Sequence, residues 1–273
     1  MESIRRAIDR ARAARVPGVE SAGGVVEQSR QIRGAVPGFI DEQPNEFELN
    51  DSLLQSNRIV AHDSANICAK PYDMLRTQVL RAMDLKDWKI LAVTSPTPGC
   101  GKTLTAINLA LSIARQPERS VLLVDMDLQR PRLASALGLK SNGGILGVLG
   151  GSIGLKDAIV QARIGNHRLM VLPAEGPSPD SSEQMASRAM SAMIQQLKVD
   201  YQPRTVILDL PPMLSGDDVI AVLPQVDCVL LVAAVGTSTI AQIEECNKHL
   251  QSTDVVRLVL NKVPEKNLKN YYY

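Results

Sequence analysis

Ten consecutive residues, 94–103 (TSPTPGCGKT), combine glycine, proline, lysine and threonine between an apolar stretch and a helical one. The stretch before them, residues 89–93, is short and apolar, as expected for a strand buried on both faces of a parallel sheet. Alanine and isoleucine recur at helical spacing in residues 106–114. This order of strand, glycine-rich turn and helix is the one that a phosphate-binding loop requires, because backbone N–H groups then converge on an anion.

Within this loop, we expect Lys102 to reach the β- and γ-phosphates of a nucleotide and Thr103 to hold Mg²⁺. The loop departs from the pattern G-x-x-x-x-G-K-[ST] because Pro96 stands at the first glycine position. The alternative interpretation is a Gly-Lys-Thr turn that only caps a helix. The predicted nucleotide contacts in the loop are Pro98, Gly99, Cys100, Gly101, Lys102, Thr103 and Leu104.

Aspartates follow two apolar stretches at the points where the predicted strands end. Asp125 and Asp127 follow residues 121–124, and Asp209 follows residues 206–208. Ligands of open parallel sheets bind beyond the carboxyl ends of the strands, and Mg²⁺ is often held there by one or two carboxylates plus substrate phosphates. We therefore expect Asp209 to polarise water on Mg²⁺, and Asp125 or Asp127 to position the metal or accept a proton from a hydroxyl. Helix capping is the alternative role.

Asn261 ends the last predicted strand, residues 256–260. A side-chain amide at this place offers the paired donor and acceptor that adenine needs, so Asn261 is a candidate nucleotide contact. The alternative is a turn residue at the strand end.

The last three residues, Tyr271, Tyr272 and Tyr273, are tyrosines in a chain that has only 5 of them. The preceding residues are polar, so we expect the cluster to be exposed. Exposed consecutive aromatics add nothing to a core, and a use as phosphate acceptors explains them better than packing onto the domain or a patch for a partner. A tyrosine hydroxyl has a pKa of about 10, so transfer to it needs positioning and a nearby carboxylate more than a strong base.

These groups converge only if a doubly wound, mostly parallel α/β sheet brings the strand ends together. The chain of 273 residues is 45% hydrophobic, enough for one sizeable α/β domain plus an appendage. The strands predicted alternate with helices, which is typical of such a sheet. They are residues 89–93, 121–124, 169–172, 206–208, 229–233 and 256–260. A helix is expected after Pro71, and the longest later helix over about residues 182–197.

The chain divides into four predicted parts: a helix (1–15), a flexible linker (16–68), the P-loop domain (69–263) and a mobile tyrosine tail (264–273). Residues 2–15 alternate small apolar residues with arginines at helical spacing, as a basic amphipathic helix does. Its apolar face is mostly alanine, which favours docking on a partner or a solvated helix over lipid binding. The linker is rich in glycine and proline without a sustained period.

Composition excludes several classes of function. A net charge of +1 gives no indication of binding to nucleic acid or anionic membranes. The longest apolar run, residues 228–235, is far shorter than the ~20 residues of a membrane span, and the N-terminus lacks the apolar segment of a signal peptide. A cytoplasmic location is therefore expected. The 4 cysteines and 3 histidines are scattered, so neither a disulfide framework nor a zinc site is indicated.

Residues 70–273 resemble the bacterial tyrosine kinases, the BY-kinases of capsule and exopolysaccharide systems, which are related to the deviant Walker ATPases MinD and ParA. The resemblance rests on the loop, on residues 124–127 with Arg130-Pro131, on residues 209–212 with Asp218, on Asn261 and on the tyrosine tail. It implies ATP and Mg²⁺ as cofactors. It implies a catalytic set of Lys102, Asp125, Asp127 and Asp209, with Thr103, Asp125 and Asp209 on the metal.

The resemblance also implies autophosphorylation of the tail on a neighbouring subunit of a homo-oligomer, and regulation of polysaccharide polymerisation and export. A membrane polysaccharide co-polymerase would activate the chain and hold it at the inner face of the membrane. Two positions depart from the family pattern. Gln129 stands where arginine commonly follows the D-x-D pair, and residues 70–76 retain only Arg76 of the E-x-x-R-x-x-R pattern used in ring assembly.

Two other functions are compatible with the same residues. The first is a MinD/ParA-like ATPase switch, whose members carry a lysine near the position of Thr97 that reaches across a dimer. The second is a nucleotide-binding regulator of polysaccharide chain length without kinase activity, in line with Pro96 and Gln129.

Overall fold

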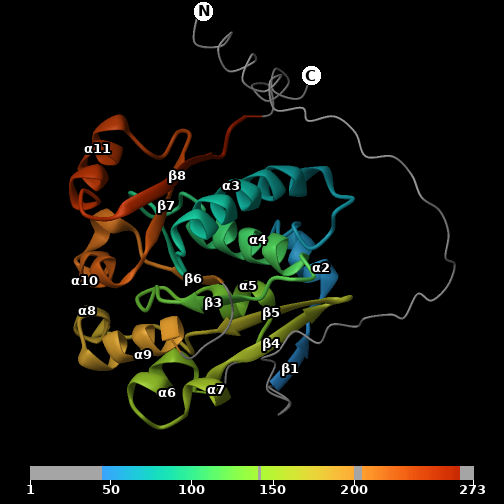
Figure 1. Ribbon diagram of the computed structural model, residues 1–273, viewed down its shortest axis with the longest axis horizontal. Helices are drawn as coiled ribbons and strands as arrows, with labels where there is room; N and C mark the ends of the chain where they lie inside the picture. The colour runs from blue at the N-terminus through green and yellow to red at the C-terminus, as the bar shows by residue number, and fades with distance from the viewer. Residues whose placement is uncertain (1–44, 141–142, 200–204, 265–273) are drawn as a thin grey trace, which may run out of the picture. The chain divides into compact units, whose positions relative to one another are not determined.

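Figure 1 shows the computed structural model, which describes residues 45–140, 143–199 and 205–264. This part of the chain forms an 8-stranded sheet in the order β1-β4-β5-β3-β6-β2-β7-β8. The strands are β1 (Asn45–Glu48), β2 (Ile90–Thr94), β3 (Val121–Asp125), β4 (Val160–Ile164), β5 (His167–Leu172), β6 (Thr205–Asp209), β7 (Cys228–Ala234) and β8 (Asp254–Asn261). Every pair is parallel except β4 with β5. The predicted mostly parallel, doubly wound sheet is confirmed.

Helices connect these strands. The longest are α3 (Lys70–Lys86), α4 (Lys102–Ala114), α9 (Arg188–Val199) and α11 (Ile240–His249). The shorter ones are α2 (Asp51–Ser56), α5 (Leu133–Leu137), α6 (Gly144–Leu149), α7 (Leu155–Ala158), α8 (Ser181–Met185) and α10 (Asp218–Val222), with 3-10 turns at Ile67–Ala69, Met213–Ser215 and Leu223–Gln225. In this part of the chain, no helix is long and apolar enough to cross a bilayer.

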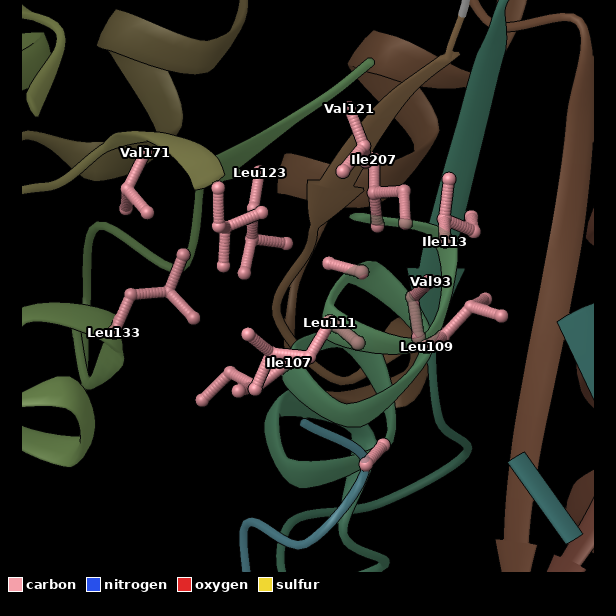
Figure 2. Close-up of a cluster of buried hydrophobic side chains, with 14 of the residues drawn as sticks. Val93, Ile107, Leu109, Leu111, Ile113, Val121, Leu123, Leu133, Val171 and Ile207 are labelled. Carbon is pink, nitrogen blue, oxygen red and sulfur yellow. The ribbon is translucent and has the colours of Figure 1, made fainter. Parts of the chain in front are cut away.

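The central strands are buried on both faces because a hydrophobic core lies on each side of the sheet. Alternate side chains of β2 point to opposite faces: Leu91 and Val93 join the core beneath α3 and α4, whereas Ile90 and Ala92 join the core beneath α9, α10 and α11. Figure 2 shows the first core, where the side chains of α4 meet those of β2, β3 and β6. This double burial explains why the central strands consist of apolar runs without alternation.

The carboxyl ends of the central strands lie side by side. Asp125 at the end of β3 is the register partner of Asp209 at the end of β6, and Val93 of β2 lies on the other side of Asp209. The chain proceeds from β2 toward β3 and β5, and later from β6 toward β7 and β8 on the opposite side. Such a reversal places the crevice for a ligand at the ends of these strands.

The predicted linker, residues 16–68, is wrong for residues 45–68, which fold with the domain. β1 adds to the sheet beside β4, and the side chains of Leu54, Ile59 and Ala61 are fully buried in the core of α3 and α4. Asn108 of α4 fixes this segment, since its Oδ1 accepts the N–H groups of Val60 at 2.8 Å and Ala61 at 2.9 Å. The rest of the predicted linker, the predicted helix 1–15 and the tyrosine tail from residue 265 onward lie outside the described residues.

Two further predictions need correction. The single helix predicted over about residues 182–197 is two helices, α8 and α9, because the Oγ of Ser187 accepts the N–H of Met190 and starts a new helix. β4 was not predicted at all. The helix predicted after Pro71 is confirmed as α3, which has this proline in its first turn.

Arg76 of α3 has its partners within the chain. Its Nη1 donates to the Oδ1 of Asp73 at 3.2 Å and to the carbonyl oxygen of Ser112 in α4 at 2.9 Å. Arg115 of α4 donates to the same carboxylate at 2.9 Å. This cluster ties α3 to α4, so the one arginine retained from the ring-assembly pattern has an internal structural role.

We expect Asn108→Ala to lower the free energy of unfolding by about 3 kcal/mol, because it leaves the buried N–H of Ala61 and the partly buried N–H of Val60 without an acceptor. Urea unfolding followed by circular dichroism measures this change. Asn247→Ala, on the exposed face of α11, is the control and is expected to stay within about 0.5 kcal/mol of the unmodified protein. Equal stability of the two variants would contradict the role given to Asn108.

Candidate functional site

The loop between β2 and α4 is held in place by the segment that follows β6. The hydroxyl of Thr94 donates to the carbonyl oxygen of Pro211 at 2.7 Å. The N–H groups of Met213 and Leu214 donate to the carbonyl oxygens of residues 95 and 96 at 2.7 and 3.1 Å. Gly99 and Gly101 adopt φ angles of +82° and +90°, which side-chain-bearing residues rarely adopt. The loop therefore has a defined conformation that depends on its glycines.

Six consecutive N–H groups of this loop and of the start of α4, from Gly99 to Leu104, have no acceptor within the described part of the chain. The last three belong to the first turn of α4, where N–H groups have no partner inside the helix. The partial positive charge of a helix N-terminus lies at the same place. This arrangement suits an anion with several oxygens, such as a nucleotide phosphate.

Lys102, the first residue of α4, lies among carboxylates. Its Nζ is 2.7 Å from the Oδ2 of Asp127 and 3.4 Å from the Oδ1 of Asp209. Burial alone would lower the pKa of Lys102, but the charges of Asp209, Asp127 and Asp125 outweigh it and raise that pKa. The lysine predicted to reach phosphates is thus paired with two of the predicted catalytic acids.

Thr103 and Asp209 form the second contact of the site. The Oγ1 of Thr103 donates to the Oδ2 of Asp209 at 2.6 Å, and Asp209 is fully buried. Burial raises the pKa of Asp209, although the charge of Lys102 and the hydrogen bond from Thr103 act in the opposite direction. A hydroxyl and a carboxylate in contact are oxygen ligands of the kind that Mg²⁺ prefers.

Asp125 has one satisfied and one unsatisfied oxygen. Its Oδ2 accepts the N–H groups of Arg132 at 3.0 Å and Leu133 at 2.9 Å, whereas its Oδ1 is buried and has no hydrogen-bond partner. Burial and then the neighbouring charge of Asp209 raise the pKa of Asp125 to about 7. An orphaned carboxylate oxygen beside a second acid fits a divalent cation. The described residues contain no group of three or more His, Cys, Asp or Glu able to hold a metal by themselves, so phosphate oxygens would have to complete the coordination.

The other predicted nucleotide contacts adjoin the loop. Cys100 is fully buried, with its Sγ 3.3 Å from the hydroxyl of Ser238 in the turn after β7. Asn261 lies against the other side of the loop, with its Nδ2 donating to the carbonyl oxygen of Cys100 at 3.0 Å. Leu104 is partly buried against the core of α3 and α4. The predicted phosphate acceptors Tyr271, Tyr272 and Tyr273 lie outside the described residues.

A second polar cluster, which sequence reasoning did not assemble, supports the loop after Asp127. The buried carboxylate of Asp218 accepts from Gln129 at 3.0 Å and from Ser181 at 3.2 Å, and also from the hydroxyl of Ser182. The cluster links the segment after β3 to the start of α8 and of α10. Neither Ser181 nor Ser182 could be singled out from the sequence, since serine is common in the first turn of a helix.

A family model described as the CobQ/CobB/MinD/ParA nucleotide binding domain matches residues 91–273. The chain belongs to this family, in agreement with the doubly wound sheet and the phosphate-binding loop.

Individual relatives narrow the class to bacterial tyrosine-protein kinases. CpsD of Streptococcus pneumoniae serotype 4, a tyrosine-protein kinase, is 31% identical over 182 residues, which cover 64% of this chain and 76% of CpsD. The kinase domain of the Escherichia coli tyrosine kinase ETK is 28% identical with a TM-score of 0.66, over 76% of this chain and 80% of that domain.

Other relatives are much longer than this chain. AmsA of Erwinia amylovora is 28% identical over 220 residues, which are 80% of this chain but only 30% of AmsA. The match to EpsB of Ralstonia nicotianae likewise covers 26% of that relative. The chain therefore corresponds to less than a third of these two proteins.

We expect Asp125→Asn to stabilise the protein at pH 8 in the presence of a chelator, by on the order of 1–3 kcal/mol. The folded-state pKa of about 7 exceeds the ordinary value of 3.8, so the folded form binds the proton more tightly and loses stability as the pH rises between these values. The asparagine carries no charge and retains an oxygen for the N–H groups of Arg132 and Leu133. Urea unfolding at pH 5 and pH 8 measures the difference, which should shrink at pH 5. A difference independent of pH would contradict this assignment.

Proposed function

We propose that this chain is an ATP- and Mg²⁺-dependent protein-tyrosine kinase that phosphorylates Tyr271, Tyr272 and Tyr273 of a neighbouring copy. The observation that carries the proposal is the contact of Lys102 with Asp127 and Asp209 directly beside the row of unpaired N–H groups. The similarity to tyrosine-protein kinases supports the choice of acceptor.

In this proposal the loop binds the β- and γ-phosphates of ATP through the N–H groups of residues 99–104. Lys102 exchanges its carboxylate partners for phosphate oxygens, which carry more negative charge. Thr103, Asp209 and the free oxygen of Asp125 would hold Mg²⁺, and the metal would supply neutralisation of charge on the phosphates.

The release of Lys102 leaves a carboxylate of Asp127 free to act as the proton acceptor. The incoming tyrosine oxygen forms a bond to the γ-phosphorus, the bond from that phosphorus to the β–γ bridging oxygen breaks, and ADP leaves. The tyrosine proton passes to Asp127. Because phosphoryl transfer has a loose transition state, positioning and charge neutralisation contribute more than the strength of this base.

The wider role proposed is regulation of exopolysaccharide or capsule polymerisation and export, with a membrane co-polymerase as activator at the inner face of the membrane. The support for it is the resemblance to the BY-kinases. The homo-oligomer that transfer between copies requires would have to assemble without Arg76, since this side chain is engaged with Asp73 and Ser112.

We expect phosphotyrosine to appear on the C-terminal peptide after incubation with Mg²⁺ and ATP, measured by mass spectrometry with the cytoplasmic segment of a co-polymerase present. Lys102→Met should abolish the signal, because the variant has lost the charge that neutralises the transferred phosphate. The matched control is Lys140→Met, a change to an exposed lysine away from the loop, which should leave the signal unchanged. No phosphotyrosine in the unmodified protein would contradict the kinase proposal.

The alternative, a MinD/ParA-like switch, is distinguished by changing the three tail tyrosines to phenylalanine. A kinase should lose autophosphorylation in this variant while its nucleotide affinity stays the same. A switch should hydrolyse ATP at an unchanged rate and form no phosphotyrosine in either protein. Binding of ATP without turnover in the unmodified protein would instead favour a regulator without kinase activity.

A further inference from the structure

Asn261 is fixed by hydrogen bonds within the chain. It is the register partner of Ala234 in β7, and its carbonyl oxygen accepts the N–H of Val235 at 3.0 Å. The next residue, Lys262, turns the chain with a φ angle of +56°. The backbone of Asn261 is therefore anchored to the end of β7, a strand of the rigid sheet.

Both polar atoms of the Asn261 side chain have protein partners. Its Nδ2 donates to the carbonyl oxygen of Cys100 at 3.0 Å, and its Oδ1 accepts the N–H of Lys262 at 2.8 Å. The second bond orients the carboxamide so that the first is made by the nitrogen. One of the two N–H donors and one of the two oxygen lone pairs of this carboxamide are thus engaged with the chain itself.

The contact with Cys100 fixes the orientation of one peptide group in the phosphate loop. In a trans peptide the C=O and the following N–H point in opposite directions. With its carbonyl oxygen held by Asn261, the Cys100–Gly101 peptide directs the N–H of Gly101 away from Asn261. That N–H is in the middle of the row of groups without an acceptor, from Gly99 to Leu104.

The fit between Asn261 and the loop is close. A Cβ added to Gly101 would lie 2.3 Å from the Nδ2 of Asn261, a distance that forces one of them to move. Gly101 is therefore required twice, for its φ angle of +90° and for the space that Asn261 occupies. The loop is supported from behind by a side chain that comes from another strand.

We propose that Asn261 is a positioning residue that holds the phosphate loop in its anion-binding conformation, an effect on phosphate binding that does not depend on the base. The inference rests on nucleotide binding by the loop, which is part of the proposed function. Without Asn261, the peptide between Cys100 and Gly101 loses the bond that orients it, and the N–H groups must be reordered when a phosphate binds.

Calorimetry with ATP, GTP and inorganic tripolyphosphate, each with Mg²⁺, tests this role, since tripolyphosphate has no base. We expect Asn261→Ala to weaken the binding of all three by about fivefold, the effect of one lost hydrogen bond, and to leave the ratio of ATP to GTP affinity unchanged. Asn261→Asp should weaken all three at least as much, because it keeps an acceptor for Lys262 but loses the donor to Cys100. Asn247→Ala, an exposed asparagine of α11, is the matched control and should bind like the unmodified protein.

The binding measurements distinguish a failure of this inference from a failure of the proposed function. A loss confined to ATP, with GTP and tripolyphosphate unaffected, would show contact with the base and overturn the inference, as would unchanged binding in both variants. Failure of the unmodified protein to bind ATP and tripolyphosphate would overturn the proposed function together with it. Thermal unfolding followed by circular dichroism shows whether each variant is folded. If Asn261→Ala does not fold, the binding measurements on Asn261→Asp test the inference.

Discussion

The structure is organised around the accumulation of like charge at the carboxyl ends of β3 and β6. Asp125, Asp127 and Asp209 lie there with little or no exposure to solvent, and Lys102 contacts two of them. Burying carboxylates side by side is unfavourable unless a cation or a proton compensates them, and the raised pKa values of Asp125 and Asp209 express this cost. Such a cluster has a stability penalty that a purely structural role does not explain, because apolar residues would fill the same space more favourably.

The surrounding fold keeps this cluster in place. The phosphate loop is held from three directions, by the backbone after β6, by Ser238 after β7 and by Asn261 at the end of β8. α4, which carries Lys102 and Thr103, is buried along most of its length, and Asn108 bonds it to the segment before α3. The loop is therefore held in place where phosphate is proposed to bind. Lys102 contacts two carboxylates, and phosphate oxygens are its third proposed partner.

The parts of the fold that were predictable are those whose signal is local. Central parallel strands are continuous apolar runs, so β2, β3, β6 and β7, with the acids that end β3 and β6, could be found from the sequence. The shorter apolar stretches in β5 and in the edge strand β8 were also sufficient. β1 and residues 49–61 were missed because their buried side chains, such as Leu54 and Ile59, are isolated in the sequence and packed against distant elements. The same holds for Asp218, whose partners Gln129 and Ser181 lie 89 and 37 residues away. The engagement of Asn261 with the loop depends on a pairing 161 residues apart, which no local pattern encodes.

Charge balance relates the contacts of Lys102 to the proposed reaction. Lys102 is the cation that contacts Asp127 and Asp209, and a bound triphosphate would compete for the same ammonium group. If the lysine moves to the phosphates, Asp125, Asp127 and Asp209 are left facing further negative charge, which is tolerable only with a divalent cation or a bound proton. In the proposed reaction, Thr103 and Asp209 would hold Mg²⁺ as that cation, and Asp127 would accept the proton of the tyrosine. In the proposed reaction, the lysine, the metal and the proton would therefore each compensate the charge of the same buried carboxylates.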